Sequence, residues 1–173
     1  MSAPYSAKAI ANYFLRLAER EGEKISPMKL QKLIYFAHGW NLAVYGGPLI
    51  SEQVQAWKYG PVIQSIYHEF KRFGAGPIKG EATSIDAKNF EIVTPMIDSG
   101  DKQTINLLDT VWRIYSGFSA IQLSNLTHRQ GTPWEVTWKT NEGMLEIGIE
   151  NDEIRKYFLA QAKKNAESAQ AAG

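Results

Sequence analysis

Apolar residues recur three or four positions apart near the start of the chain, which is the spacing of a helix that buries one face. Residues 7–21 form such a repeat, and Gly22 is a typical residue to end it. Serine followed by proline at positions 26 and 27 indicates a second helix, because serine caps free amide groups and proline fits the first turn. We expect this second helix over about residues 27–45, ending at the Gly-Gly-Pro of residues 46–48.

The second predicted helix is apolar on more than one side. Its apolar residues are Leu30, Leu33, Ile34, Phe36, Ala37, Trp40, Leu42 and Val44. A helix of this kind belongs in the protein interior, so we expect it to be central and largely buried. His38 in the same helix is then more simply a hydrogen-bonded structural residue than a ligand.

The middle of the chain predicts less regular structure. Residues 51–58 alternate loosely between polar and apolar, which suggests a short strand. Tyr59-Gly60-Pro61 reads as a turn whose proline opens a third helix through about Arg72. Residues 73–100 are rich in Gly, Pro, Ser and Asp, and we interpret them as an irregular, mobile connection with one short strand at 90–93.

Helical spacing returns over residues 102–116. Ser119 and Gln122 match a capping box for a short helix at about 120–127. Pro133 is expected to start a turn.

The end of the chain predicts one further helix. Residues 144–149 are expected to be extended, and Asn151 to cap a helix that runs to about Lys164. Residues 165–173 lack an apolar stripe, and we expect a disordered tail there. The fold class is therefore mainly α: a compact single-domain bundle of about six helices with one or two short strands, spanning residues 1–164.

Composition narrows the class of protein. A hydrophobic fraction of 44% is ordinary for a globular chain, and a net charge of +1 gives no bulk attraction to nucleic acid or anionic membrane. Cysteine is absent, which excludes disulfides, thiol catalysis and cysteine-ligated metal. The first residues do not resemble a signal peptide, and no apolar run approaches the roughly 20 residues of a membrane span. We expect a soluble cytoplasmic protein.

The common signatures of catalysis are missing. The sequence contains neither Gly-Lys-[Ser/Thr] nor Gly-x-Ser-x-Gly, and its three histidines are far apart. We therefore expect no enzyme, no cofactor and no metal site. A hydrolase or nuclease without a local signature stays an alternative, because many active sites leave none.

Nucleic-acid binding would require a local basic patch. Lys29 and Lys32 could form a small basic edge on the second helix, but that helix is too apolar all round to lie in a groove of DNA. A solvated face whose lysine stems cover the core explains the pair more simply. Nucleic acid is not an expected partner.

Two separated motifs carry a resemblance to a known family. The segment from Met28 to Trp40, Met-Lys-Leu-Gln-Lys-Leu-Ile-Tyr-Phe-Ala-His-Gly-Trp, is followed by Ala56-Trp57 and Tyr59-Gly60-Pro61-Val62. Leu123–His128 and then Pro133-Trp134 form the second motif. Together they resemble the SocA-like, Panacea-domain antitoxins, which include phage-associated GepA-like proteins, over about residues 6–160.

This resemblance implies a mainly α-helical antitoxin that neutralises a protein toxin, encoded by an adjacent gene, through direct contact. A role in phage defence follows from the same resemblance. One alternative implied by the family is an adaptor that delivers its toxin to a Clp protease. A DNA-binding regulator is a weaker alternative, since the chain has no added DNA-binding module. The sequence predicts no oligomeric state.

Candidate residues fall into two groups. For toxin binding we single out Tyr59, Lys29, Lys32, Trp134, Trp138 and Lys139, because aromatic anchors often dominate protein interfaces. For the structural motif we single out Leu30, Leu33, Trp40, Trp57, Gly60, Pro61 and His128. His128 follows a helix end, where its side chain can reach the last carbonyls.

Overall fold

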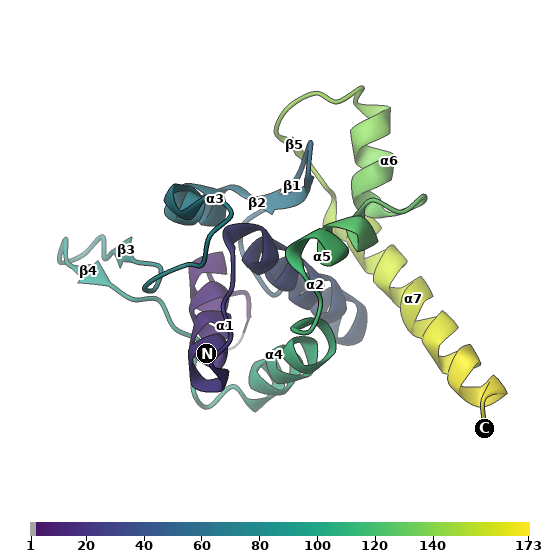
Figure 1. Cartoon of the computed structure of the whole chain (residues 1–173), viewed down its shortest axis with the longest axis horizontal. Coiled ribbons are helices and arrows are strands. Elements are labelled where there is room, and N and C mark those ends of the chain that lie inside the picture. The colour runs from purple at the N-terminus through teal and green to yellow at the C-terminus, as the bar shows by residue number, and fades with distance from the viewer. Residues whose placement is uncertain (1–2) are drawn as a thin grey trace.

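The computed structural model describes residues 3–173 of the chain. Figure 1 shows a helical protein with two very small sheets. In chain order the elements are α1 (Ala7–Glu21), α2 (Pro27–Tyr45), β1 (Val54–Trp57), β2 (Gly60–Ile63), α3 (Gln64–Phe70), a 3₁₀ turn (Lys71–Phe73), β3 (Ser84–Ile85), β4 (Ile92–Val93), α4 (Lys102–Tyr115), α5 (Ala120–Thr127), α6 (Pro133–Thr140), β5 (Ile147–Gly148) and α7 (Asn151–Ala171).

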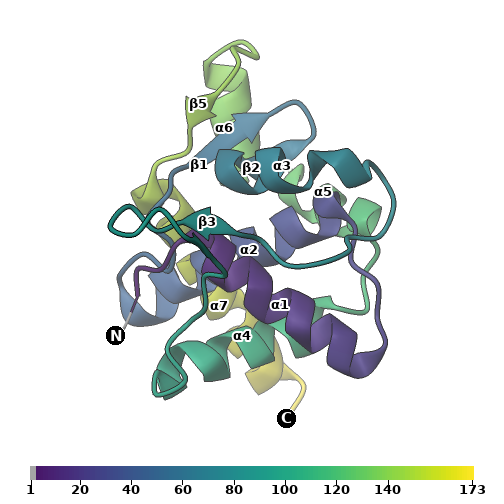
Figure 2. The same ribbon diagram turned by 90° about the vertical axis from the view of Figure 1, so that its left-hand side faces the viewer.

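Helix α2 lies at the centre, as its all-round apolar surface predicts. It contacts α1, α3, α4, α5, α7 and strand β2 (Figure 1). Its start has the expected chemistry: the Ser26 hydroxyl accepts a hydrogen bond from the amide of Lys29, and Pro27 occupies the first turn. Gly46 ends it with a left-handed φ of 77°, which glycine adopts without strain. Figure 2 shows α1 lying across this central helix.

Helix α7 packs closely against α2 at Gly39. The Phe158 ring sits where a side chain at Gly39 would be, and it meets the ring of Trp40 edge-on at 5.1 Å between centroids. Next to Gly39, the buried His38 also contacts α7, with its Nε2 2.9 Å from Oδ1 of Asn151. Nδ1 of His38 accepts a hydrogen bond from the amide of Leu49 at 3.3 Å. The prediction of a hydrogen-bonded structural histidine is confirmed.

The predicted third helix begins later than Pro61, so that prediction is wrong. Pro61 pairs with Ala56 in an antiparallel hairpin of β1 and β2, and α3 starts only at Gln64. Proline is tolerated because β2 is an edge strand of the sheet β2–β1–β5. The Gln31 side chain also holds the end of β2, accepting from the amide and donating to the carbonyl of Ile63 at 2.9 and 3.0 Å.

Within residues 73–100, the segment around β3 and β4 projects from the helices as an arm (Figure 1). Its only regular structure within the described residues is the two-stranded pair β3–β4, of which β4 falls in the strand predicted at 90–93. Asn12 of α1 holds the base of the arm: its side chain donates to the carbonyls of Ala82 and Pro95 at 3.0 and 2.9 Å.

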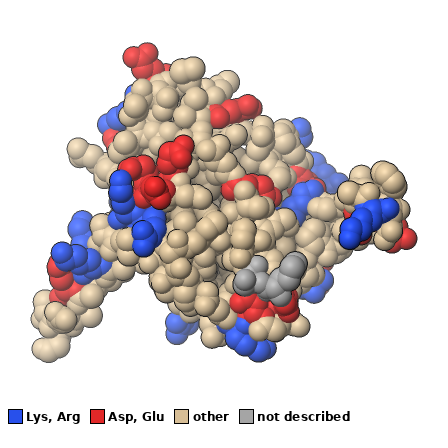
Figure 3. Space-filling model, turned by 180° about the vertical axis from the view of Figure 1, so that it is seen from behind, with Lys and Arg blue, Asp and Glu red and all other residues tan. Residues whose placement is uncertain are grey.

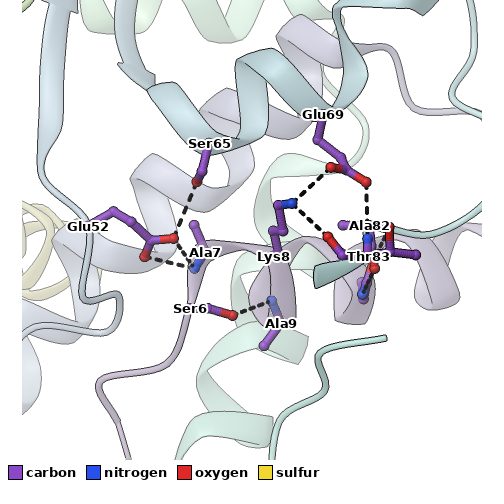
Figure 4. Close-up of polar contacts among 10 residues, drawn as sticks. Ser6, Ala7, Lys8, Ala9, Glu52, Ser65, Glu69, Ala82 and Thr83 are labelled. Atoms are coloured by element: carbon purple, nitrogen blue, oxygen red, sulfur yellow. Dashed lines mark hydrogen bonds and ion pairs between the residues drawn. The ribbon is translucent and has the colours of Figure 1, made fainter. Parts of the chain in front are cut away.

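Two acidic side chains tie the start of α1 to its neighbours (Figure 4). Both carboxylate oxygens of Glu52 accept from the amide of Ala7, at 3.0 and 2.9 Å. Lys8 forms an ion pair with Glu69 of α3 at 2.9 Å. Burial alone would raise the pKa of the Glu69 carboxyl, but hydrogen bonds from Lys8 and from the backbone of Thr83 lower it overall.

Three further predictions about the end of the chain need correction. Residues 133–140 form helix α6, not a turn, because the Thr132 hydroxyl accepts from the amide of Glu135 and proline takes the first turn. The last helix continues to Ala171, well past 164, because its Ala, Gln, Lys and Glu residues favour helix and no stop signal precedes Gly173. Asn151 is the first helical residue rather than the cap, and Glu150 precedes it.

The mainly α fold class is confirmed. Within residues 3–173 there are seven α-helices and five short strands, one helix more than about six and more strands than the one or two expected. No helix in this part of the chain is both long enough and apolar enough to span a bilayer.

Replacing Gly39 with alanine should destabilise the protein. The added methyl carbon would lie 2.2 Å from Cε2 of Phe158, so the ring or the helix must move. This overpacking outweighs the gain of roughly 1 kcal/mol that alanine gives a helix, and we expect a net loss of about 1–2 kcal/mol in unfolding free energy. Gly47→Ala is the matched control, with no heavy atom within 4 Å. Urea denaturation followed by circular dichroism measures the unfolding free energy of both variants. If Gly39→Ala were as stable as the wild type, the close packing of α7 on α2 would be contradicted.

The buried His38 should make stability depend on pH. Burial lowers the pKa of its imidazole below the ordinary 6.5, although the hydrogen bond to Asn151 acts in the opposite direction. The unfolded chain therefore binds the proton first, and the stabilisation is lost as pH falls through 6.5 towards the folded-state pKa. His38→Gln keeps hydrogen-bonding groups but cannot titrate. The stability advantage of the wild type over this variant should shrink as the pH falls from about 7.5 to about 5.5. A constant stability difference over this range would contradict a lowered pKa of His38.

Candidate functional site

A groove of about 550 Å³ opens between the start of α2, the β1–β2 hairpin and α3. Leu145 and Glu146, from the loop between α6 and β5, complete one side. The other lining residues are Pro27, Met28, Gln31, Lys32, Trp57, Lys58, Tyr59, Val62, Ile66, Tyr67, Lys71 and Gly74. Most of these residues are apolar or aromatic, and no aspartate or histidine is among them.

The rim of the groove carries large exposed side chains. Tyr59 is 65% exposed, Tyr67 41% and Leu145 78%. The rings of Trp57 and Tyr67 meet edge-on, with centroids 4.8 Å apart. Side chains of this size, held at the edge of a hollow, are suited to contact a partner.

The hairpin at the rim is held by backbone contacts. The indole Nε1 of Trp134 in α6 donates to the carbonyl of Trp57 at 2.6 Å. The hydroxyl of Ser124 in α5 donates to the carbonyl of Tyr59 at 3.2 Å. Because these contacts use the backbone, the Tyr59 ring stays available for binding while its chain segment is fixed.

Lys32 lies at the bottom of the groove and is 2% exposed. Its ammonium donates to the carbonyl of Pro61 at 3.1 Å. Gly60 has a φ of 114°, which favours glycine, and a Cβ there would stand 2.9 Å from the Lys32 nitrogen. Burial lowers the pKa of the Lys32 ammonium from 10.5 to about 7.

The candidate binding residues do not form one cluster. Tyr59 and Lys32 both line the groove, although Lys32 is buried and so does not belong to a solvated basic edge. Lys29 lies outside the groove, and its ammonium donates to the carbonyl of Ser116. Lys139 is paired with Glu135 on the surface of α6.

The two tryptophans of α6 support the fold around the groove. Trp134 is buried, and the Trp138 ring stacks on it with centroids 5.7 Å apart. His128 caps α5: its Nδ1 lies 2.6 Å from the carbonyl oxygen of Ser124, as its position at a helix end predicts. Its ring also packs against the ring of Trp134, with centroids 4.0 Å apart.

The remaining residues of the structural motif are placed as follows. Leu30 and Leu33 are fully buried, and Trp40 is partly buried in the core. Trp57 and Gly60 face each other across the hairpin. The structural roles of these residues stay predictions.

Sequence reasoning missed part of the groove. Tyr67 of α3 was not among the candidates, but it lines the groove and is partly exposed at its rim. Met28, in the first turn of α2, also lines the groove, and no local sequence pattern indicates this. Leu145 joins the groove from a segment far along the chain, and only the tertiary fold brings it there. Within residues 3–173 no three acidic or histidine side chains are grouped in a way that could hold a metal.

Comparison with known proteins assigns the chain to a family. Residues 30–135 match the family described as "Antitoxin SocA-like, Panacea domain". Antitoxin SocA of Caulobacter vibrioides (strain NA1000 / CB15N) is 38% identical over 146 residues, which cover 83% of this chain and 76% of that protein. The chain belongs to the SocA-like, Panacea-domain family. No solved structure matches it.

The segment shared with the Panacea family contains most of the groove. Residues 30–135 include most of α2, the whole β1–β2 hairpin and α3. They exclude Met28 on one side and Leu145 on the other. The groove is thus built mainly from the family-matched segment, and residues shortly before and after that segment complete its lining.

Replacing Lys32 with methionine should change how stability depends on pH. The folded-state pKa lies below that of the unfolded chain, so the unfolded chain binds the extra proton between about pH 7 and about pH 10. Wild-type stability relative to Lys32→Met should therefore rise with pH over that range, and the variant should be the more stable protein near pH 7. Chemical denaturation at several pH values measures this. Lys58→Met, which removes an exposed lysine of the same rim, is the control. If the stability difference between wild type and Lys32→Met did not change with pH, the burial of the Lys32 ammonium would be contradicted.

Proposed function

We propose that this Panacea-family protein is an antitoxin that neutralises a cognate protein toxin by binding it directly at the groove. The observation that carries the proposal is the preformed apolar hollow in the family-matched segment, rimmed by the exposed Tyr59 and Tyr67. The SocA relative supports the antitoxin role by its name. The toxin would be encoded by an adjacent gene, and both proteins would act in the cytoplasm, with phage defence as one setting.

The groove has the properties of the centre of a protein interface. Aromatic side chains around a hollow provide much contact area for little loss of conformational entropy. A specific complex buries about 1,200–2,000 Å² in total, more than the groove alone can supply. The surrounding surface would therefore take part, while the groove receives the anchoring side chains of the toxin.

We propose contact rather than catalysis as the mode of action. Glu146 is the one carboxylate that lines the groove, so a pair of acid and base side chains is not assembled there. Lys32 is held by the Pro61 carbonyl and not by a catalytic partner. A bound toxin would be inhibited by covering the surface that it needs for its own reaction.

The distribution of charge does not favour nucleic acid as the partner. On the face shown in Figure 3, lysine and arginine side chains are interspersed with aspartate and glutamate rather than gathered in one basic surface. Lys32 is buried and Lys29 is engaged with a backbone carbonyl, so the pair offers no basic edge to a phosphate backbone.

Co-purification with the product of the adjacent gene tests the proposal. Tyr59→Glu places a charge on the exposed rim and should weaken the complex at least about tenfold, or about 1.4 kcal/mol. Tyr45→Glu is the matched control, because Tyr45 is 45% exposed at the end of α2 and does not line the groove. Calorimetry with purified proteins and survival of cells that express the toxin are the two measurements.

The outcomes separate the possible modes of action. Inhibition of the toxin by purified antitoxin alone supports direct neutralisation. A complex that leaves the toxin active, together with toxin loss only in cells that contain Clp protease, would instead indicate a proteolytic adaptor. Equal affinities of the two tyrosine variants would remove the groove from the interface, and failure to form any complex would refute the proposal.

A further inference from the structure

The groove contains a buried cation that has no anion beside it. Lys32 is 2% exposed, and its ammonium makes one hydrogen bond, to the neutral carbonyl of Pro61. The salt bridges formed within residues 3–173 do not include it. An ammonium has three N–H donors, so this one retains capacity for a further partner.

An unpaired buried charge costs several kcal/mol, and the cost falls when a counter-charge approaches. Lys32 is among the residues that line the open groove. A partner that fills the groove with apolar side chains alone would isolate the charge further. A partner that brings a carboxylate would pair with the ammonium where the dielectric constant is low, and the attraction there is strong.

The other charges of the lining favour the same sign of partner. Lys58 and Lys71 stand at the rim with Lys32 below them, against the single acidic residue Glu146. The ammonium of Lys58 lies 5.4 Å from the ring centroid of Tyr59, so a positive charge accompanies the exposed aromatic edge. Three lysines against one glutamate give this mostly apolar groove a net positive charge.

We infer that the groove receives an apolar segment of the toxin that carries one aspartate or glutamate, and that this carboxylate pairs with Lys32. The inference rests on the proposed function and names the chemistry of the partner at the same site. Apolar residues of the segment would lie against Trp57, Val62 and Tyr67, while the carboxylate reaches the lysine below. Lys32 would thus act as a selector, since an apolar segment without an acid leaves the cation buried and unpaired.

A purely structural lysine would give a different pattern. If Lys32 served only to hold the β1–β2 hairpin through Pro61, its replacement would affect stability and would not couple to any one residue of the toxin. A pairing role predicts energetic coupling between Lys32 and one toxin carboxylate. Double-mutant cycles measure that coupling directly.

The test uses the full-length antitoxin and the toxin encoded by the adjacent gene. Each toxin aspartate or glutamate is changed in turn to asparagine or glutamine, and the affinity of each variant is measured against wild type and Lys32→Met. We expect one toxin carboxylate whose removal weakens binding at least about tenfold to the wild type and has little effect on Lys32→Met. Lys29→Met is the matched control, because Lys29 lies on the same helix but outside the groove.

The pH dependence of affinity is a second readout. Since the free lysine has a pKa of about 7, raising the pH deprotonates it before binding, and affinity should fall by up to about tenfold per pH unit above pH 7. Lys58, Lys71, Tyr59, Tyr67 and Glu146 also face the groove, while Gly60, Pro61 and Thr127 near the ammonium are neutral. Lys32→Met retains all of these groups, so its flat profile would assign the dependence to Lys32.

Each result decides the question. A complex in which no toxin carboxylate couples to Lys32 overturns the inference while direct neutralisation stands. Absence of any complex overturns both. Because the toxin variants need no change in the antitoxin, the coupled carboxylate can be sought even if Lys32→Met does not fold. If the antitoxin bound a single-stranded oligonucleotide in a salt-sensitive way, and Lys32→Met abolished that binding, the groove would be a nucleic-acid site and the inference of an acidic toxin segment would be overturned.

Discussion

Burial of α2 on all its sides is the constraint on which the other helices depend. Almost every residue from Leu30 to Leu42 is removed from solvent, so this helix needs neighbours all around it. Helices α1, α4, α5 and α7 meet that need, and each has its own more restricted apolar face towards the centre. The approach of α7 is close because Gly39 leaves room for the Phe158 ring, and the contact between His38 and Asn151 sets its position along α2.

The groove is the place where this enclosure is incomplete. Over the first turns of α2 the cover consists of a short hairpin and the seven-residue α3, which leave a hollow rather than a packed interface. Lys32 projects from α2 under that cover, and the backbone of the hairpin provides its hydrogen bond. Burial of a charged residue on a central helix lowers the stability of the fold. Under the proposed function, a partner that pairs with the Lys32 ammonium would reduce this cost.

The groups that hold the hairpin in place are separate from the side chains that are exposed at its rim. The hairpin is held through the carbonyls of Trp57 and Tyr59, which α6 and α5 contact, so the side chains at its rim contribute little to the fold. Residues such as Tyr59 and Leu145 can therefore change without loss of the core. Since about 1.4 kcal/mol alters affinity tenfold, a few rim substitutions would, under the proposed function, be enough to change the affinity for a toxin.

The sequence alone determined the central helix, the bounds of α1 and α2 and the capping box of α5, because each depends on spacing and capping within a few residues. It misplaced the start of α3, since the pairing of Pro61 with Ala56 also depends on contacts from Gln31, far away in the chain. It identified Tyr59 and Lys32 as candidates but placed Lys32 on a solvated face. Only the tertiary structure buried Lys32 and brought Leu145 to the same groove as Tyr67, because a groove is formed by segments that no local pattern connects.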